Sequence, residues 1–222
     1  MKPVVAIDGP AGSGKSTVAR AAAQALGLPM LETGAMYRAL TWAVLQAGLD
    51  PGDAAAVGQL AAQVRIDVGE RVLVDGRDVT AAIRSAEVNA AVSAVSAVPA
   101  ARATMVACQR EWIDSHGGGV LEGRDVGTVV APGAVLKVFL VASEEERAWR
   151  RQRQDAASQG DIAQTRESIR RRDAYDSTRA VSPLVVAPDA VVLDTTGRAV
   201  VDVVAEVVAR YRAAMDRGCP PE

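Results

Sequence analysis

The sequence predicts an α/β fold in which a mostly parallel sheet lies between layers of helices. Three observations lead to this prediction. Short apolar runs alternate with helical segments, a glycine-rich loop separates the first apolar run from the first helix, and hydrophobic residues make up 49% of the chain. Alternating strands and helices place helices on both faces of a parallel sheet, giving three α/β/α layers. A length of 222 residues favours one domain with insertions.

The first part of the chain shows the clearest alternation. Residues 3–8 form an apolar run that predicts a buried parallel strand, and the Ala-rich residues 15–27 predict the helix after it. Residues 30–32 predict a second short strand. A helix is expected at 33–47, with Thr33 as its N-cap.

The middle of the chain departs from this pattern. A weak helix at 54–63 is followed by two short β-prone runs, 64–68 and 71–74, with turn residues between and after them. These runs predict a small antiparallel hairpin system, which we interpret as an insertion into the parallel core. Two helices are expected next, at 85–97 and from Pro99 to about 115.

The alternation returns in the last part of the chain. Ser143 and Glu146 have the spacing of a capping box and open an arginine-rich helix. The other expected elements are strands at 120–122, 135–141 and 191–193, and helices at 163–176 and 199–215. This order places further parallel strands beside the first one.

The glycine-rich loop fits the phosphate-binding pattern G-x-x-x-x-G-K-[ST] at every position. Its residues are Gly9, Pro10, Ala11, Gly12, Ser13, Gly14, Lys15 and Ser16. Glycines let backbone N–H groups point at phosphate oxygens, and the following helix adds its positive dipole end. Lys15 is expected to bridge the β- and γ-phosphates of ATP, Ser16 to ligate Mg²⁺, and Thr17 to contact the α-phosphate. Motors, GTPases and kinases share this motif.

Composition excludes several functional classes. The net charge of −2 argues against a surface for nucleic acid, and no N-K-x-D run for reading guanine is present. Cys108 and Cys219 lack the spacing of a metal site or a disulfide framework, and His116 is expected at an exposed helix end. No apolar run reaches the ~18 residues of a membrane span. We therefore expect a cytoplasmic protein, monomeric, with small-molecule partners and no membrane or nucleic-acid partner.

The segment 31–38 suits a second, phosphate-bearing substrate. It places a hydroxyl, a glycine, an aromatic ring and a guanidinium within one and a half turns. Purely structural interpretations of these residues remain open. Thr33 would be a simple helix cap, Tyr37 a packed core ring, and the arginines of 147–153 a solvated helix face. The three tryptophans, Trp42, Trp112 and Trp149, are expected to be packing rings.

Six motifs, in this order, resemble those of the bacterial cytidylate kinase family over essentially the full length. They are GPAGSGKST (9–17), ETGAMYR (32–38), EVNAAVSAVSAVPAAR (87–102), EGRDVGTVV (122–130), EEERAWRR (144–151) and RRDAYDSTRAVSPL (171–184). The resemblance implies a P-loop core, an insert at about 62–100 that binds a nucleoside monophosphate, and a lid at about 144–160. It also implies ATP-dependent phosphorylation of cytidine and deoxycytidine monophosphate (CMP and dCMP).

The resemblance also implies roles for individual residues. Arg124 matches an arginine that grips the acceptor phosphate, with Asp125 as its neighbouring carboxylate. Arg172 and Arg179 match arginines that contact phosphate or sugar, and Arg150 matches a lid arginine that closes over the ATP phosphates. The residues implied to hold the acceptor are Thr33, Tyr37, Arg38, Ser93, Arg102, Arg124, Asp125, Arg172, Asp176 and Arg179. Ser93 and Arg102 would address the cytosine ring and Asp176 the sugar hydroxyls, although Ser93 in a small-residue helix is also consistent with tight helix packing.

Two positions depart from the family pattern. Glu32 and Glu122 stand where the family more often has Asp, which moves each carboxylate outward by one methylene. The residue that orients the magnesium shell is therefore open between Glu122 and Asp125. The acceptor is already an anion near pH 7, so alignment and charge neutralisation by Lys15, Mg²⁺ and arginines suffice without a general base.

Two rival functions remain. The nearer is another small-molecule P-loop kinase, acting on uridylate, adenylate, shikimate or dephospho-coenzyme A. The more distant is a nucleotide switch or nucleic-acid-binding ATPase, which the charge and the missing guanine motif disfavour. For a kinase, we expect the insert and the lid to close only when substrates bind, with Gly160 as a hinge, because an open site would let water take the phosphoryl group.

Overall fold

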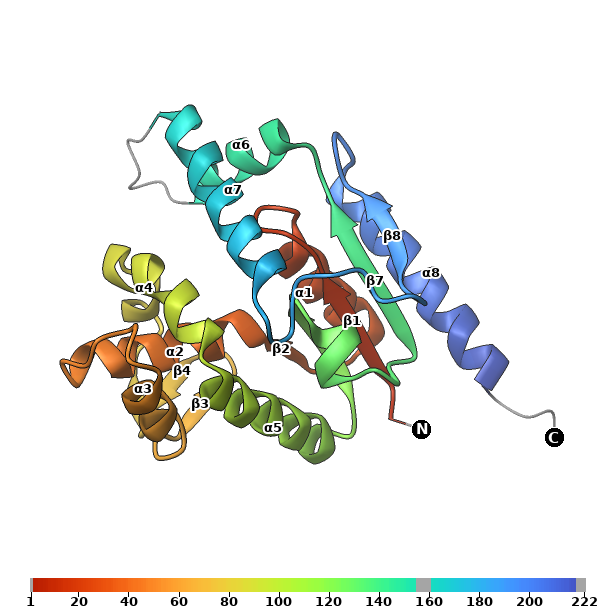
Figure 1. Cartoon of the computed structure of the whole chain (residues 1–222). Helices are drawn as coiled ribbons and strands as arrows, with labels where there is room; N and C mark the ends of the chain where they lie inside the picture. Colours follow the sequence, from red (N-terminus) through yellow and green to blue (C-terminus); the bar gives the residue numbers. More distant parts are fainter. Residues whose placement is uncertain (1, 155–160, 219–222) are drawn as a thin grey trace. The chain divides into compact units, whose positions relative to one another are not determined.

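The computed structural model describes residues 2–154 and 161–218 (Figure 1). The predicted hinge Gly160 and the last part of the predicted lid lie outside the described residues. The chain divides into two compact units: unit 1 comprises residues 1–30 and 115–222, and unit 2 comprises residues 31–114.

Unit 1 is built on a parallel sheet. With β2 (Met30–Glu32) at one edge, the strand order is β2-β6-β1-β7-β8. β1 (Val4–Asp8) pairs with β6 (Gly119–Gly123) on one side and β7 (Leu136–Val141) on the other. β8 (Val191–Asp194) pairs with β7 at one edge. The predicted α/β fold with a parallel sheet flanked by helices is confirmed.

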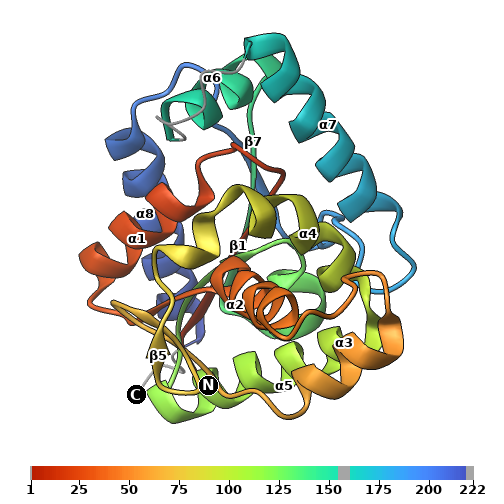
Figure 2. The ribbon, with the colours of Figure 1, turned by 90° about the vertical axis from the view of Figure 1, so that its left-hand side faces the viewer.

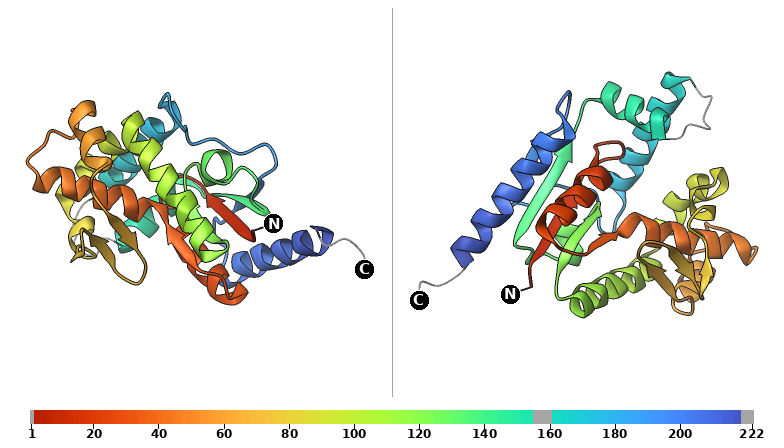
Figure 3. Two further views of the ribbon diagram at one scale, coloured as in Figure 1. Left: turned by 90° about the horizontal axis from the view of Figure 1, so that it is seen from below. Right: turned by 180° about the vertical axis from the view of Figure 1, so that it is seen from behind.

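Helices α1 (Lys15–Leu26) and α8 (Val200–Gly218) cover one face of this sheet, as the right-hand view in Figure 3 shows. Their apolar side chains meet those of the strands in one core. α6 (Glu144–Gln154) and α7 (Ile162–Thr178) follow β7 and pack against each other. Ser143 caps α6 as its spacing predicts, since the Glu146 N–H donates to Ser143 Oγ at 3.2 Å. The reciprocal bond of a capping box is replaced, because the Ser143 N–H donates to Thr196 Oγ1 at 2.9 Å.

Unit 2 consists of helices and a small antiparallel sheet (Figure 2). The predicted hairpins are confirmed, and the sheet has the order β3-β4-β5. β2 begins at Met30, the last residue of the first segment of unit 1, and leads into unit 2. The elements that follow it are α2 (Thr33–Gln46), α3 (Ala54–Ala61), β3 (Ile66–Val68), β4 (Val72–Val74), β5 (Arg77–Asp78), the 3-10 helix η1 (Ala82–Arg84), α4 (Ala86–Ala97) and α5 (Pro99–His116). The apolar face of α2 packs against the sheet and forms the core of this unit.

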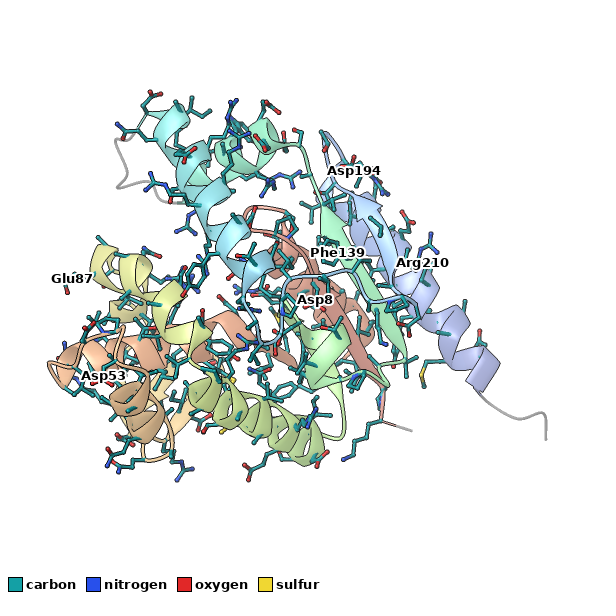
Figure 4. The ribbon with its side chains drawn as sticks, in the orientation of Figure 1. Asp8, Asp53, Glu87, Phe139, Asp194 and Arg210 are labelled. Atoms are coloured by element: carbon teal, nitrogen blue, oxygen red, sulfur yellow. The ribbon has the colours of Figure 1, made fainter. Side chains whose placement is uncertain are left out.

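One helix cap differs from the prediction. The N-cap of α2 is Glu32, and no side chain caps the helix there; Thr33 is the first helical residue and is buried. The prediction of Thr33 as an N-cap was therefore wrong by one position. By contrast, Asp53 caps α3 by accepting the N–H groups of Ala55 and Ala56, and Figure 4 labels it.

No single helix among the described residues is long and apolar enough to cross a membrane. Helices α4 and α5 reach the length and apolar composition of a membrane span only when they are taken together, and the chain bends by 94° where they meet.

Candidate active site

The phosphate loop connects the buried strand β1 to α1. Gly9, Gly12 and Gly14 have φ values of 149°, 76° and 91°, in the left-handed region that side chains disfavour. A Cβ at Gly9 would lie 2.2 Å from the Leu140 carbonyl oxygen. The loop therefore requires glycine at these positions, and it ends at Lys15, the first residue of α1.

Lys15 lies buried against its own loop. Its Nζ donates to the Pro10 carbonyl oxygen at 2.7 Å. Burial, followed by the positive charge of Arg124, lowers the pKa of Lys15 to about 7, and Arg172 acts in the same direction. Two guanidinium groups are therefore near enough to Lys15 to disfavour its charge, which is an arrangement suited to a bound polyanion.

Ser16 and Glu122 meet on the other side of the loop. The Ser16 Oγ donates to Glu122 Oε1 at 3.1 Å, and the Glu122 side chain comes from the end of β6. A hydroxyl beside a carboxylate offers the oxygen ligands that Mg²⁺ prefers. In the described residues, no group of three or more His, Cys, Asp or Glu side chains could by itself hold a metal ion.

Asp8, at the end of β1, holds the turn that follows β6 (Figure 4). Its carboxylate accepts the N–H of Val126 at 3.0 Å and that of Gly127 at 2.7 Å. These two amides begin the π-helical turn η2 (Val126–Val130), directly after Arg124 and Asp125. Burial raises the pKa of Asp8 to about 6, although both amide hydrogen bonds oppose this effect.

Arg124 and Arg179 share the carboxylate of Asp176. The Arg124 Nε donates to Asp176 Oδ2 at 2.9 Å, and Arg179 Nη1 lies 3.6 Å from Asp176 Oδ1. Arg179 Nη2 also lies 3.9 Å from Asp125 Oδ1. Since Arg124 lowers the pKa of Lys15, unit 1 brings this cluster close to the phosphate loop.

Arg150 is anchored to the segment after β8. Its Nη1 donates to Thr195 Oγ1 at 2.8 Å and its Nη2 to the Thr195 carbonyl oxygen at 2.7 Å. The Thr195 hydroxyl in turn lies 3.1 Å from the carbonyl oxygen of Ser13 in the phosphate loop. The predicted lid arginine is therefore connected to the loop through one buried threonine.

A pocket of about 420 Å³ lies beside the phosphate loop within unit 1. Trp149 lines it and is 48% exposed, so the prediction of a packing ring was wrong for this tryptophan. The guanidinium of Arg153 stacks 4.7 Å from the centroid of the Trp149 ring. The pocket is lined by Ser13, Gly14, Thr17, Val18, Glu146, Trp149, Arg150, Arg153, Thr195, Arg198, Ala199, Val200 and Val203.

Unit 2 carries the remaining predicted residues. The Arg102 guanidinium lies 5.2 Å from the centroid of the Tyr37 ring, and its Nη1 donates to the Ser96 carbonyl oxygen at 3.0 Å. Arg102 is 2% exposed. Ser93 lies half-buried on α4, where its carbonyl oxygen accepts the hydroxyl of Ser96.

Arg38 is buried on α2 and held by an amide side chain. Its Nη1 donates to Asn89 Oδ1 at 2.6 Å and to the Ile83 carbonyl oxygen at 3.3 Å. Glu32 lies near Arg84, 3.4 Å from its Nη2. The two units therefore hold separate sets of predicted residues: Thr33, Tyr37, Arg38, Ser93 and Arg102 belong to unit 2, and the others belong to unit 1.

Comparison with known proteins decides the family. A protein-family model described as cytidylate kinase matches residues 5–213. The chain belongs to the cytidylate kinase family. It is 51% identical over 208 residues to a cytidylate kinase of Mycobacterium leprae, covering 92% of this chain and 93% of that protein. A cytidylate kinase of Mycolicibacterium paratuberculosis is 54% identical over 200 residues, covering 87% and 88%.

More distant similarities agree with this assignment. A bifunctional pantoate ligase/cytidylate kinase of Synechococcus is 49% identical over 227 residues, which are 97% of this chain and 42% of that protein. Among solved structures, a gluconokinase of Sinorhizobium meliloti superposes with a TM-score of 0.53 at 18% identity, covering 97% of this chain and 95% of that one. At this identity, the likeness concerns the fold alone.

Sequence reasoning missed several residues of this cytidylate kinase family member. Asn89, Asp173 and Thr195 each hold a predicted site residue or the phosphate loop itself, and Asp8 holds the turn that follows Arg124 and Asp125. Asn89 and Asp173 stand inside quoted motifs and Asp8 stands beside one, so their position near predicted residues was the available signal. Thr195 lies outside every quoted motif, and its partner Arg150 lies 45 positions away, so nothing in the sequence indicated its role.

Proposed function

We propose that this chain transfers the γ-phosphoryl group of ATP to CMP, with dCMP as a second acceptor, giving ADP and the nucleoside diphosphate. The observation that carries the proposal is the arrangement of Arg124, Arg179 and Asp176 near Lys15 in a cytidylate kinase family member. A phosphate loop alone would suit any nucleotide hydrolase. A second group of cations beside it gives an acceptor phosphate a place to bind.

The donor phosphates would bind in the phosphate loop, with Lys15 on the β- and γ-phosphates and Ser16 on Mg²⁺. The contact between Ser16 and Glu122 supports Glu122 rather than Asp125 as the carboxylate of the magnesium shell. Asp125 instead lies beside Arg179. Magnesium would neutralise charge on the donor phosphates.

The donor base would occupy the pocket lined by Trp149 and Val200. Both side chains are exposed and apolar, and both line a hollow whose wall includes Gly14 and Thr17. An aromatic ring beside an apolar wall suits the face of a purine. A volume of about 420 Å³ also falls in the usual range for small-molecule sites.

The acceptor base would be read in unit 2 by Arg102 and Ser93. Arg102 is buried and stacked near Tyr37, so its guanidinium is fixed in one orientation. A guanidinium and a hydroxyl are donors, and cytosine presents O2 and N3 as acceptors. Thr33 and Arg38 would hold the acceptor phosphate, and Asp176 would accept hydrogen bonds from the sugar hydroxyls.

The reaction would proceed by alignment and charge neutralisation. The acceptor phosphate carries a second pKa of about 6, so it is an anionic nucleophile at pH 7 without a general base. Lys15, Arg124, Arg150, Arg172 and Arg179 would stabilise the charge that spreads over the transferring group. Arginine contacts of this kind contribute roughly 10³- to 10⁵-fold in rate in related phosphoryl transfers.

The predicted insert at 62–100 and lid at 144–160 also stay proposals. The insert lies inside unit 2, and the whole of α6 lies in the proposed lid. Closure of these segments over both nucleotides would exclude water, so ATP turnover without acceptor should be far slower than with CMP. A cytoplasmic monomer acting on small nucleotides remains the proposed state of the protein.

An acceptor panel tests the function directly. The chain is assayed with Mg·ATP and each of CMP, dCMP, UMP, AMP, shikimate and dephospho-coenzyme A, and ADP formation is followed. We expect the highest kcat/KM with CMP; a preference for any acceptor outside the cytidine pair would overturn the proposal. In the same assay Arg102→Met should raise the KM for CMP about tenfold or more while leaving the KM for ATP unchanged.

A further inference from the structure

Both polar groups of the Ala11 backbone are held by side chains from α6 and α7. The Ala11 N–H donates to Asp173 Oδ1 at 2.9 Å, and Arg147 Nη1 donates to the Ala11 carbonyl oxygen at 3.1 Å. Arg147 also forms an ion pair with Asp173. The three groups therefore close a ring of contacts around the third residue of the phosphate loop.

The α6–α7 hairpin packs directly on the same part of the loop. A Cβ at Gly12 would lie 2.7 Å from the Arg147 carbonyl oxygen and 3.0 Å from the Arg147 Cβ. Ala11, Ala148 and Ile169 form a small apolar cluster that joins the loop to both helices. The contact of the ion pair with Ala11 is thus part of a close-packed interface.

Contacts from outside matter for the shape of the phosphate loop because the loop is rich in glycine. Gly12 and Gly14 have left-handed φ values, and glycine adopts such conformations and their alternatives about equally readily. The Asp173 carboxylate lies close enough to Lys15 and Arg124 to act on the charge of both. It therefore supplies negative charge to a region rich in cations.

We propose that Arg147 and Asp173 are positioning residues for the donor triphosphate: by fixing the Ala11 backbone they keep the phosphate loop in its anion-binding shape. The proposal rests on the donor role given to this loop under the proposed function. Neither side chain needs to touch the reacting atoms. Loss of the pair should weaken binding of the triphosphate more than binding of the acceptor.

A simpler role would be to join α6 to α7 without any effect on the loop. The chain offers a matched control for this case, because Arg170 on α7 lies 3.3 Å from Glu144 on α6. That pair joins the same two helices and does not contact the loop through any described hydrogen bond. Arg170→Met therefore removes a link within the hairpin while leaving Ala11 held.

The experiment compares Arg147→Met, Asp173→Ala, Asp173→Asn and Arg170→Met with the unchanged chain. Binding of Mg·ATP and of inorganic tripolyphosphate is measured by calorimetry without acceptor, and the KM for CMP and the Tm are measured alongside. We expect Arg147→Met and Asp173→Ala to weaken both donors about tenfold or more, the loss typical of one charge-assisted hydrogen bond. The KM for CMP should change less than threefold (about the error of such assays).

Asp173→Asn keeps an oxygen for the Ala11 N–H and loses the charge that attracts Arg147. Its affinity for Mg·ATP and tripolyphosphate should therefore lie between those of Asp173→Ala and the unchanged chain. It also keeps the test decisive if Asp173→Ala does not fold. Equal donor affinities for Arg147→Met, Asp173→Asn and Arg170→Met would overturn the proposal, as would equal increases in the KM of both substrates. Failure of the unchanged chain to bind tripolyphosphate would instead count against the proposed function.

Discussion

The hydroxyl of Ser16 lies within hydrogen-bonding distance of the carboxylate of Glu122, 3.1 Å from its Oε1. This contact joins the first turn of α1 to the end of β6. It places a hydroxyl beside the carboxylate of a Glu, whose side chain is one methylene longer than that of the Asp more usual in the family. These are oxygen ligands of the kind that a phosphate-bound Mg²⁺ would need.

Replacing Glu122 should impair magnesium use. Glu122→Gln removes the charge and should lower kcat/KM by roughly 10- to 100-fold, with a higher magnesium concentration needed for half-maximal rate. Glu122→Asp should lose less, because it keeps the charge. The measurement is the initial rate against free Mg²⁺ at saturating ATP. A larger rise in the magnesium requirement for Asp125→Asn than for Glu122→Gln would assign the role to Asp125.

ATP binding should take up a proton above pH 7. Lys15 has a pKa of about 7 in the free chain, so at pH 8 it is mostly neutral. A bound triphosphate favours the charged form and raises this pKa, so the proton comes from solvent. Calorimetry in two buffers of different ionisation enthalpy should show uptake rising toward about one proton from pH 6 to pH 8. Lys15→Arg stays charged throughout and should show none of this uptake; unchanged proton exchange in that variant would contradict the assignment.

The stability of the chain should depend on Asp8 in mildly acidic solution. Its pKa lies near 6 when folded, above the 3.8 of an exposed Asp, so the folded chain binds more protons between these values. The free energy of unfolding should therefore fall as pH rises from about 4 to about 6, by about 3 kcal/mol in all. Urea unfolding at several pH values measures this slope, and Asp8→Asn should lack it. An identical slope in both proteins would refute the prediction.

The fluorescence of Trp149 should change when the donor nucleotide binds, without any acceptor present. In a Trp42→Phe, Trp112→Phe background, Mg·ATP should change the Trp149 fluorescence, since the ring lines the proposed base pocket. Trp149→Ala should raise the KM for ATP roughly tenfold, because one base–aromatic stack contributes about 1–3 kcal/mol. Its affinity for inorganic tripolyphosphate, which has no base, should stay the same. An equal loss of affinity for tripolyphosphate would place the effect in the phosphate loop instead.

The sequence predicted the architecture well where local signals are strong. The strand–loop–helix unit at 3–27 follows from an apolar run, a glycine pattern and a terminal glycine, and Gly27 does adopt the left-handed conformation at φ 65°. The hairpins of 64–74 were visible because turn residues interrupt short β-prone runs. Three local features escaped prediction: the two-residue strand β5, the 3-10 helix η1 and the π-helical turn η2.

Side-chain partners were harder to foresee than elements. Several arginines lie on α6, and only the family resemblance separated Arg147, whose contact with the phosphate loop was not expected, from Arg150, which contacts Thr195. Their partners lie 136 and 45 positions away, so only the packed fold determines them. Trp149 was misjudged for a related reason: a large apolar ring usually packs inside, and its exposure reflects the pocket that it lines.

The close approach of Arg147 to Gly12 also bears on drug resistance. Any substitution at position 12 would set a Cβ 2.7 Å from a main-chain oxygen, in a left-handed conformation that other residues resist. A small-molecule inhibitor seated against the Gly12 backbone would thus contact a position that cannot mutate without damage to the loop. Escape from such a compound would have to arise elsewhere in the chain.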